Sequence, residues 1–530
     1  MLSDHSPVLV LALGYSPGMR VSKDGRRSGT VVACLVAILV LAPACAARVK
    51  DPLAQPSVID ARDRRVRTLQ ADLAAIFAAP AVAQGLVAVA VTSLDRRDTL
   101  FRHNASRLAM PASNMKLLTL AAAAERLGWE YTFTTTIRAT GPVEDGVLKG
   151  DLVVRGTGDP TLNSRQVSPM PILDGWADTV RAAGIRRIAG RLVGDDDAFD
   201  EQALGQGWSW DYLQDGYAAP TGALQVYEDA VAITIAPGDT VGAPTHACFA
   251  TPGSGWAILN AAVTGAPGSS STLSVQRFRG STVVRLTGSM PPTAQTITRT
   301  LAVDNPTVYF LGLLAAALES RGITIGGGTA DIDDLPSGSV AASGQSIVEY
   351  RSPPLDQAAR TMMTISQNLY AETLLRAIGR VDGRTASAAD GRAAVLEVLN
   401  AWGLPAGSVV IADGSGLSRY NYATADVLTR VLQHMYDDPR HRQHWMDAFP
   451  AGGDPGTLQK RFVGTIAEGR VRAKTGSIAN VRALSGYVLS AGGEQLAFSI
   501  LINNITASSE AIFQVIDAAV LRLAAFSRQH

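Results

Sequence analysis

Residues 111–128 read PASNMKLLTLAAAAERLG, and this stretch places a serine and a lysine three residues apart at the start of an apolar run. The run has the length and composition of a buried helix. Residues three apart in a helix lie on one face, so the amine of Lys116 can reach the hydroxyl of Ser113. The stretch therefore predicts a helix that begins near Ser113 and carries a nucleophile and a base in its first turn.

The lysine is notable because the chain rarely uses lysine. Only 6 of its 47 basic residues are lysine, and the others are arginine. Arginine stays protonated in proteins, whereas a lysine amine can lose its proton when it is buried or lies near another cation. Since Ser-x-x-Lys also arises by chance, the interpretation depends on further motifs.

Two further motifs follow in order. Residues 366–368 read SQN within a helical stretch, and residues 474–477 read KTGS before a pair of expected strands. Serine and asparagine alone could be ordinary helix caps. The ordered set Ser-x-x-Lys, Ser-x-Asn and Lys-Thr-Gly is, however, the motif set of β-lactamases and penicillin-binding proteins.

The chain resembles the D-alanyl-D-alanine carboxypeptidase/endopeptidase family of low-molecular-mass penicillin-binding proteins, in the class with a large insertion between the first two motifs. Here Ser366 lies 253 positions after Ser113. Gln367 replaces the usual aspartate of the second motif, and Pro455 interrupts a common Asp-Gly-Thr-Leu. Other stretches that match the family are DPTL (159–162), GDDDAFD (194–200), GWSWDYL (207–213), YAAP (217–220), SQNLYAETLLR (366–376), DGSGLSRYN (413–421) and GTLQKRF (456–462).

The resemblance implies a catalytic mechanism with a role for each motif residue. Ser113 attacks the carbonyl of the penultimate D-alanine and forms an acyl-enzyme. Lys116 acts as the base, with a pKa lowered by burial and by Lys474 as a second cation. Ser366 passes a proton to the leaving amine, and Asn368 holds Lys116 and the substrate amide.

The resemblance also implies the contacts to substrate. The backbone N–H groups of Ser113 and Ser477 form the oxyanion hole. Thr475 and the lysine before it bind the terminal carboxylate, and Gly476 belongs to the same substrate-binding strand. Asp159 is a further expected substrate contact. We expect no cofactor and no metal.

The implied fold is α/β, a penicillin-binding-protein or β-lactamase-like transpeptidase domain with an antiparallel sheet flanked by helices, split by a β-rich inserted module. The catalytic domain is expected over residues 48–130 plus 345–530. The β-rich insertion is expected over residues 131–344, as one module or as two nested subdomains. Periodicity predicts helices at 62–77, 355–379, 390–403 and 424–437, strands from Gly85, Asp98, Ala483 and Gln495, and a closing helix from about Ser508.

The N-terminus has the order of a secretory signal. Three basic residues precede an apolar run over 31–41, and small residues follow. The run is too short to span a bilayer. We expect a signal peptide at 19–47, with the true start at Met19, and export to the periplasm. Plain cleavage is favoured over lipidation at Cys45.

Several patterns are interpreted conservatively. The formal net charge is zero, which gives no reason to expect a nucleic-acid partner. Cys248 is expected to be buried filler. The histidines 434, 441 and 444 lack a matched acidic partner in the sequence and are assigned to a polar helix and turn. The acidic GDDDAFD is assigned to a turn instead of a calcium site.

The expected partners are peptidoglycan peptides, with β-lactam antibiotics as inhibitors and peripheral membrane or cell-wall association as an open alternative. Two other functions stay open. A β-lactamase would need fast deacylation by a positioned water and would not need the insertion. A catalytically inert cell-wall-binding protein would form no acyl adduct.

Overall fold

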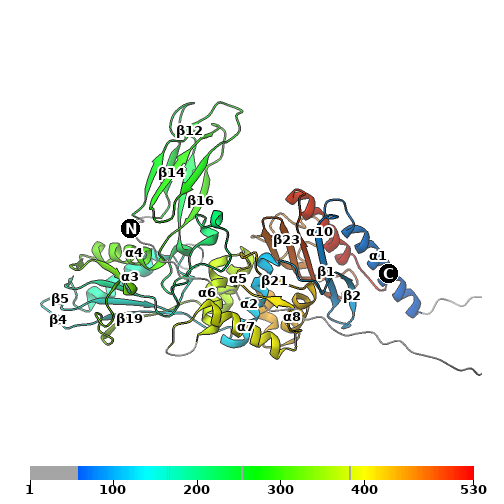
Figure 1. Ribbon diagram of the computed structural model, residues 1–530, viewed down its shortest axis with the longest axis horizontal. Coiled ribbons are helices and arrows are strands. Elements are labelled where there is room, and N and C mark those ends of the chain that lie inside the picture. Colours follow the sequence, from blue (N-terminus) through cyan, green and yellow to red (C-terminus); the bar gives the residue numbers. More distant parts are fainter. Residues whose placement is uncertain (1–57, 164, 166–167, 252–254, 381–383, 530) are drawn as a thin grey trace, which may run out of the picture. The chain divides into compact units, whose positions relative to one another are not determined.

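The structure is a computed structural model that describes residues 58–163, 165, 168–251, 255–380 and 384–529 (Figure 1). The expected signal peptide at 19–47, and residues 48–57 of the expected catalytic domain, lie outside the described residues. Within the described part, none of the helices combines the length and the apolar character that a membrane crossing requires.

A five-stranded sheet joins the two ends of the chain. Its strand order is β2-β1-β24-β23-β22, and every neighbouring pair is antiparallel. The first hairpin therefore lies beside the last three strands, with Leu86 opposite Asn503. The strands are β1 (Leu86–Ser93), β2 (Thr99–His103), β22 (Val471–Ile478), β23 (Val481–Leu489) and β24 (Gln495–Asn503).

The two faces of this sheet pack against different helices. Along β1 the side chains alternate, with valines at 87, 89 and 91 on one face and alanines at 88 and 90 on the other. The valine face packs on α1 (Val58–Phe77) and α10 (Ser509–Ala524), which contact each other (Figure 1). The small alanines leave room for helices on the opposite face.

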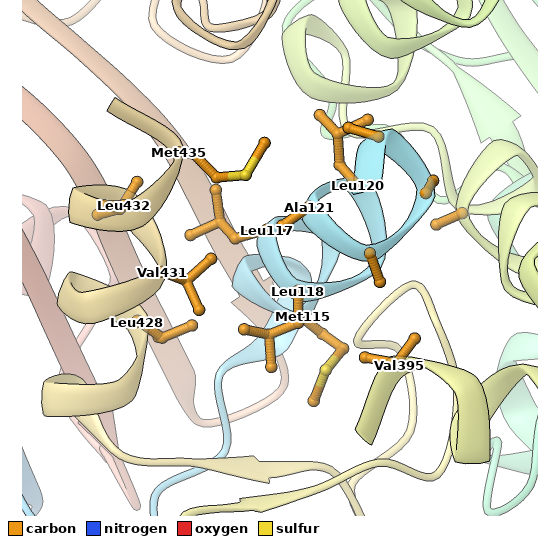
Figure 2. Close-up of a cluster of buried hydrophobic side chains, with 14 of the residues drawn as sticks. Met115, Leu117, Leu118, Leu120, Ala121, Val395, Leu428, Val431, Leu432 and Met435 are labelled. Atoms are coloured by element: carbon orange, nitrogen blue, oxygen red, sulfur yellow. The ribbon is translucent and has the colours of Figure 1, made fainter. Parts of the chain in front are cut away.

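The helix that follows the hairpin is enclosed on the alanine side of the sheet. Helix α2 (Met115–Leu127) is buried along its first ten residues. Figure 2 shows Met115, Leu117 and Leu118 of this helix near Val395 of α7 (Ala388–Ala401) and near Leu428, Val431, Leu432 and Met435 of α8 (Ala425–Asp437). Because α2 is packed on all sides along this length, the positions of the side chains that it carries are fixed relative to the sheet and the neighbouring helices.

The sequence predicted one helix through residues 355–379, and this is wrong at one point. The chain forms α5 (Leu355–Thr364) and α6 (Asn368–Gly379), with a break between them. Ser366 lies in the break with a positive φ of 64°. Gln367 is the N-cap of α6, and its side chain accepts a hydrogen bond from the N–H of Leu369. Gln367 thus fills the capping position of this helix.

The insertion contains a first core around a mixed sheet of order β18-β8-β6-β3-β19 and a smaller sheet of order β17-β7-β5-β4. Helices α3 (Pro169–Ala182) and α4 (Pro306–Ser320) pack in this core. The strands are β3 (Thr134–Ala139), β4 (Val143–Glu144), β5 (Val147–Leu148), β6 (Leu152–Gly156), β7 (Arg187–Ile188), β8 (Leu192–Asp195), β17 (Thr324–Ile325), β18 (Thr329–Asp331) and β19 (Gln345–Arg351).

A second core lies between two three-stranded sheets, of order β10-β9-β16 and β11-β14-β13. Cys248 lies on β10 and is exposed, so the expectation that it is buried filler is wrong. On β10, Ala247 and Phe249 face the second core, so Cys248 between them faces the opposite side of the sheet. The strands are β9 (Ala230–Ala236), β10 (His246–Phe249), β11 (Ala257–Asn260), β12 (Val263–Thr264), β13 (Ser274–Arg277), β14 (Val283–Thr287), β15 (Ser289–Met290) and β16 (Ile297–Ala302).

Candidate active site

Ser113 lies in a single 3₁₀ turn, η1 (Ala112–Asn114), that leads directly into α2. The turn is closely packed, because a Cβ atom on Gly416 would lie 1.8 Å from the carbonyl oxygen of Ala112. Ala112 itself has a positive φ of 46°. The predicted α-helical start near Ser113 is thus a tighter turn, and it leaves Ser113 half-buried at the N-terminal end of a buried helix.

Lys116 is fully buried, and its amine has three neighbours. Its Nζ lies 3.0 Å from the Oγ of Ser113, 2.6 Å from the Oδ1 of Asn368 and 2.7 Å from the carbonyl oxygen of Ser415. The amide oxygen and the carbonyl oxygen can only accept hydrogen bonds. A neutral amine that donates to both therefore directs its lone pair at the hydroxyl of Ser113.

Asn368 is held at both ends of its amide. Its Oδ1 accepts from Lys116, and its Nδ2 donates to the carbonyl oxygen of Tyr217 at 2.8 Å. Tyr217 belongs to the insertion, in the 3₁₀ turn η3 (Gly216–Ala218). The insertion therefore fixes which way this amide faces.

The second lysine approaches the second serine. Lys474, on strand β22, is buried, and its Nζ donates to the Oγ of Ser366 at 2.7 Å and to the carbonyl oxygen of Thr475 at 3.0 Å. The left-handed backbone at Ser366 directs its side chain to this amine. KTGS, which was expected before the strand pair, lies inside the edge strand itself.

Strand β22 lies against the turn that carries Ser113. The Nδ2 of Asn114 donates to the carbonyl oxygen of Lys474 at 3.1 Å. A Cβ atom on Gly476 would lie 2.7 Å from the carbonyl oxygen of Pro111 and 2.9 Å from the Nδ2 of Asn114. Glycine at 476 therefore permits the close approach of strand and turn, and Asn114 is a positioning residue that the sequence did not reveal.

A cavity of about 370 Å³ opens over these groups. Five of the predicted site residues line it, namely Ser113, Ser366, Asn368, Thr475 and Ser477. Lys116 and Lys474 lie buried behind them. The remaining wall comes from Tyr212, Tyr217, Leu417, Thr457, Ile478 and Ala479. Tyr212 and Tyr217 come from the insertion, so two modules together enclose the cavity.

Both buried lysines have lowered proton affinity. Burial lowers the pKa of Lys116 to about 7, although the nearby carboxylates of Asp413 and Glu372 act in the opposite direction. Burial, and after it the positive charge of Lys116, lowers the pKa of Lys474 well below its usual value. Repulsion between the two cations therefore contributes to the lowered pKa of Lys474, whereas burial is the cause of the lowered pKa of Lys116.

The segment DGSGLSRYN contributes more than sequence reasoning assigned to it. Ser415 supplies the carbonyl oxygen that accepts from Lys116, and Thr119 of α2 donates to the carbonyl oxygen of Gly414 at 2.7 Å. Asp413 and Glu372 are both buried. The glycine-rich pattern marked a turn, but its contact with Lys116 depends on segments distant in the sequence.

Asp159 is not among the residues that line this cavity, and the expected substrate contact stays a prediction. Asp159 is only 3% exposed, and its Oδ1 accepts from the N–H and the Oγ1 of Thr161. This burial raises the pKa of Asp159 to about 6. These hydrogen bonds stabilise the turn formed by DPTL.

Two of the three histidines do have acidic neighbours, contrary to the prediction, and one of these is His444, whose Nδ1 lies 3.7 Å from the Oδ2 of Asp356. His441 Nε2 lies 3.0 Å from Glu125 Oε2, and Trp129 Nε1 donates to His441 Nδ1. Asp438 completes a group with metal-ligand spacing, and Arg440 pairs with both carboxylates. The Trp129 contact makes Nδ1 an acceptor, so Nε2 carries the proton and donates to Glu125. A second acidic group of this spacing lies near GDDDAFD, at Asp196, Glu201 and Asp333.

Comparison with known proteins agrees with this arrangement. Residues 69–525 match the model of the D-Ala-D-Ala carboxypeptidase 3 (S13) family. A D-alanyl-D-alanine carboxypeptidase of an Actinomadura species is 36% identical over 490 residues, which cover 89% of this chain and 88% of that protein. The D-alanyl-D-alanine carboxypeptidase DacB of Haemophilus influenzae is 28% identical over 419 residues, covering 78% of this chain and 84% of that protein.

A solved structure has the same architecture. The crystal structure of penicillin binding protein 4 (dacB) from Haemophilus influenzae superposes with a TM-score of 0.72 at 25% sequence identity. The match covers 84% of this chain and 94% of that chain. The fold is therefore that of a penicillin-binding protein with an inserted module, as the sequence predicted.

Proposed function

Because the chain belongs to the D-Ala-D-Ala carboxypeptidase 3 (S13) family and is a D-Ala-D-Ala carboxypeptidase, we propose that Ser113 is the residue that its peptide substrate acylates. One observation supports this assignment above the others. The amine of Lys116 lies 3.0 Å from the Oγ of Ser113, and its two other neighbours can only accept hydrogen bonds. Lys116 is the general base of the proposal.

In the proposed acylation step, the neutral amine of Lys116 takes the hydroxyl proton of Ser113. The Oγ then bonds to the carbonyl carbon of the penultimate D-alanine. The N–H groups of Ser113 and Ser477, on the wall of the cavity, stabilise the developing oxyanion.

Collapse of the intermediate breaks the bond to the terminal D-alanine. The leaving nitrogen takes the hydroxyl proton of Ser366, and the amine of Lys474, which lies 2.7 Å from that Oγ, returns a proton to it. The proton that Lys116 took from Ser113 balances this transfer, so the pair of lysines neither gains nor loses a proton overall. Thr475, on the wall of the cavity, binds the terminal carboxylate, with the amine of Lys474 behind it as the nearby positive charge and Gly476 in the same strand. Water then hydrolyses the ester and restores the hydroxyl of Ser113.

Penicillin offers a strained amide carbonyl to the same serine, so β-lactams are the proposed inhibitors. Endopeptidase cleavage of a peptide cross-link is proposed as a second use of the same acyl-enzyme. It differs only in the amine that leaves, and the contacts of Ser113 and Lys116 are the same for both reactions.

The test uses a labelled penicillin and a peptide that ends in D-Ala-D-Ala, with the wild-type protein beside Ser113→Ala. We expect a long-lived adduct on the peptide that contains Ser113, release of D-alanine, and neither in the variant. Rapid penicillin hydrolysis without D-alanine release would instead identify a β-lactamase. Absence of both adduct and hydrolysis would favour a cell-wall-binding protein.

The location and the division of the chain remain proposals. We propose periplasmic export through the segment 19–47, and association with the cell wall through the substrate. We also propose the catalytic domain as 48–130 plus 345–530 and the insertion as 131–344, except that β19 (Gln345–Arg351) pairs with β3 and is therefore grouped with the insertion. The pairing of β1 with β24 supports a catalytic domain built from both ends of the chain. The two separate cores of the insertion support two nested subdomains.

A further inference from the structure

The carbonyl oxygen that accepts from Lys116 belongs to a short loop, residues 413–418, here called the base loop. The carbonyl oxygen of Ser415, in this loop, lies 2.7 Å from the Nζ of Lys116. Gly416 in the same loop packs against Ala112, next to the nucleophile. The position of the base loop therefore decides where the lone pair of Lys116 is directed.

Asp413 is the hub of the base loop. It is fully buried, and its Oδ1 accepts from the N–H of Gly416 at 2.7 Å and from the Nδ2 of Asn421 at 2.5 Å. Its Oδ2 accepts from the N–H of Ser418 at 2.6 Å and from the indole Nε1 of Trp208 at 2.8 Å. Trp208 belongs to the insertion, so one of the four donors to this hub comes from outside the catalytic domain.

A second connection runs through helix α6. The Oε1 of Glu372 accepts from the N–H groups of Gly414 at 3.1 Å and Ser415 at 2.8 Å. Arg376, one turn further along the helix, lies 4.0 Å from the Oε2 of Glu372. Its Nη2 donates to the carbonyl oxygen of Gln202 in the insertion at 2.6 Å.

Arg376 is 1% exposed, and its Nε also lies 3.8 Å from the Oδ1 of Asp200 in the insertion. A buried guanidinium needs such partners, because an unpaired charge in the interior is costly. The insertion therefore supplies partners to Arg376, and Arg376 faces the carboxylate that holds the base loop.

We propose that the insertion positions the general base: Trp208 acts through Asp413, and residues 200–202 act through Arg376 and Glu372, to hold the Ser415 carbonyl against Lys116. This inference rests on the proposed function. It makes Trp208 a positioning residue for the reaction, and it gives the insertion a role in the proton transfer as well as in enclosing the cavity.

The charged groups around Lys116 determine the direction in which each variant should shift the proton affinity of Lys116. They are Lys474 on β22, Glu372 and Arg376 on α6, and Asp413 in the base loop. Glu372 and Asp413 raise the proton affinity of Lys116. A hydrogen-bond donor partly compensates the negative charge of Asp413, so removal of such a donor should raise the proton affinity of Lys116. Removal of the Glu372 charge should lower it.

The first test compares Trp208→Phe with Trp210→Phe. Trp208→Phe removes the indole N–H and keeps an aromatic ring, and Trp210, in the same segment, is 86% exposed. The rate of acylation by labelled penicillin is measured from pH 5.5 to 9.5. For Trp208→Phe we expect the acidic side of the rate profile, the acid limb, to move to higher pH by about half a pH unit. The acylation rate on that limb should therefore fall about threefold, and the rate at pH 9 should change little. Trp210→Phe should overlay the wild type.

The second test uses Glu372→Gln, whose amide oxygen can still accept from Gly414 and Ser415. Burial raises the pKa of Glu372 to about 7, so its charge develops over the same pH range as the deprotonation of Lys116. Because the variant lacks this charge, the acid limb should move to lower pH, opposite to Trp208→Phe. A uniform loss at all pH values in either variant, or equal effects of the two tryptophan variants, would overturn the proposal. If thermal melts show that Trp208→Phe and Glu372→Gln both fail to fold, these contacts are only structural and the proposal also fails.

These outcomes are distinct from failure of the proposed function. If wild-type protein forms no adduct on Ser113 at any pH, the proposed function is wrong. If wild type is acylated and its pH profile is unchanged by Trp208→Phe and Glu372→Gln, only the role of the insertion is wrong.

Discussion

Lys116 shows how one residue acquires its chemistry from its surroundings. A lysine in water is protonated at neutral pH, and a protonated amine cannot accept the proton of Ser113. Complete burial in α2 lowers the pKa of Lys116 to about 7, and two acceptor-only neighbours align the amine. Burial thus creates the base, and the two buried carboxylates keep its pKa from falling further.

The first prediction concerns the protonation of this base. The acylation rate should rise with pH through about 7 and level above it, because only the neutral amine acts. Lys116→Arg should reduce the rate by about 10³-fold, since a guanidinium keeps its proton. Stopped-flow measurement with labelled penicillin from pH 5 to 9.5 gives both values.

The matched control is Lys460→Arg, because Lys460 is exposed. Its acylation rate should equal that of the wild type at every pH. A flat pH profile in the wild-type protein would show that Lys116 is not the base.

At the scale of elements, the site forms where a turn, a helix break and an edge strand meet. The turn η1 presents Ser113, the break between α5 and α6 presents Ser366, and β22 presents Lys474. Positive φ values at Ala112 and Ser366 show that two of these elements adopt uncommon backbone geometry. Surrounding packing has to stabilise that geometry, since a left-handed residue other than glycine is disfavoured.

Gly416 permits the closest of these contacts. It has a φ of 85°, and a Cβ atom there would lie 1.8 Å from the carbonyl oxygen of Ala112 and 2.9 Å from the N of Ser113. Gly416→Ala should therefore displace η1 and reduce acylation of Ser113 by more than about tenfold, with a lowered melting temperature. Acylation kinetics and thermal melts measure the two effects.

The control for this variant is Gly403→Ala. Gly403 also has a positive φ, of 68°, but nothing lies within 4 Å of its Cβ position. It should show only the backbone cost, about 1 kcal/mol of unfolding free energy, with unchanged acylation. Similar losses of activity in both variants would mean that the contact with Ala112 does not matter.

At the scale of the whole molecule, function requires ionisable groups inside a large core. Lys116 and Lys474 are both 0% exposed, and both have pKa values below those of an unfolded chain. Between about pH 7 and 10, the unfolded state therefore binds more protons than the folded state. Stability contributed by these lysines rises with pH over that window and falls as pH decreases towards 7.

This linkage predicts a measurable difference in the pH dependence of stability. The free energy of unfolding of the wild type, from urea titrations between pH 7 and 9.5, should have a more positive slope than that of Lys116→Met, which lacks one titrating amine. Lys460→Met, at an exposed position, should keep the wild-type slope. Parallel slopes for wild type and Lys116→Met would contradict the lowered pKa of Lys116.

The amino-acid sequence by itself determined the three motifs, the family, the class of fold and most of the helices and strands of the catalytic domain. Local patterns suffice for these, because the period of apolar residues reflects secondary structure and the motifs are contiguous. The predicted pairing of Ser113 with Lys116 needed only the spacing of residues along a helical turn. In the structure, the Oγ of Ser113 lies 3.0 Å from the Nζ of Lys116.

The tertiary structure alone decided how the site is supported. Asn114, Tyr217, Asp413 and Glu372 gained their roles from contacts across long separations in the sequence, and the burial of Asp159 could not be foreseen from its motif. The break at Ser366 also escaped a pattern that suits one continuous helix. Burial, charge and backbone strain depend on what packs around a residue, and no local pattern specifies those neighbours.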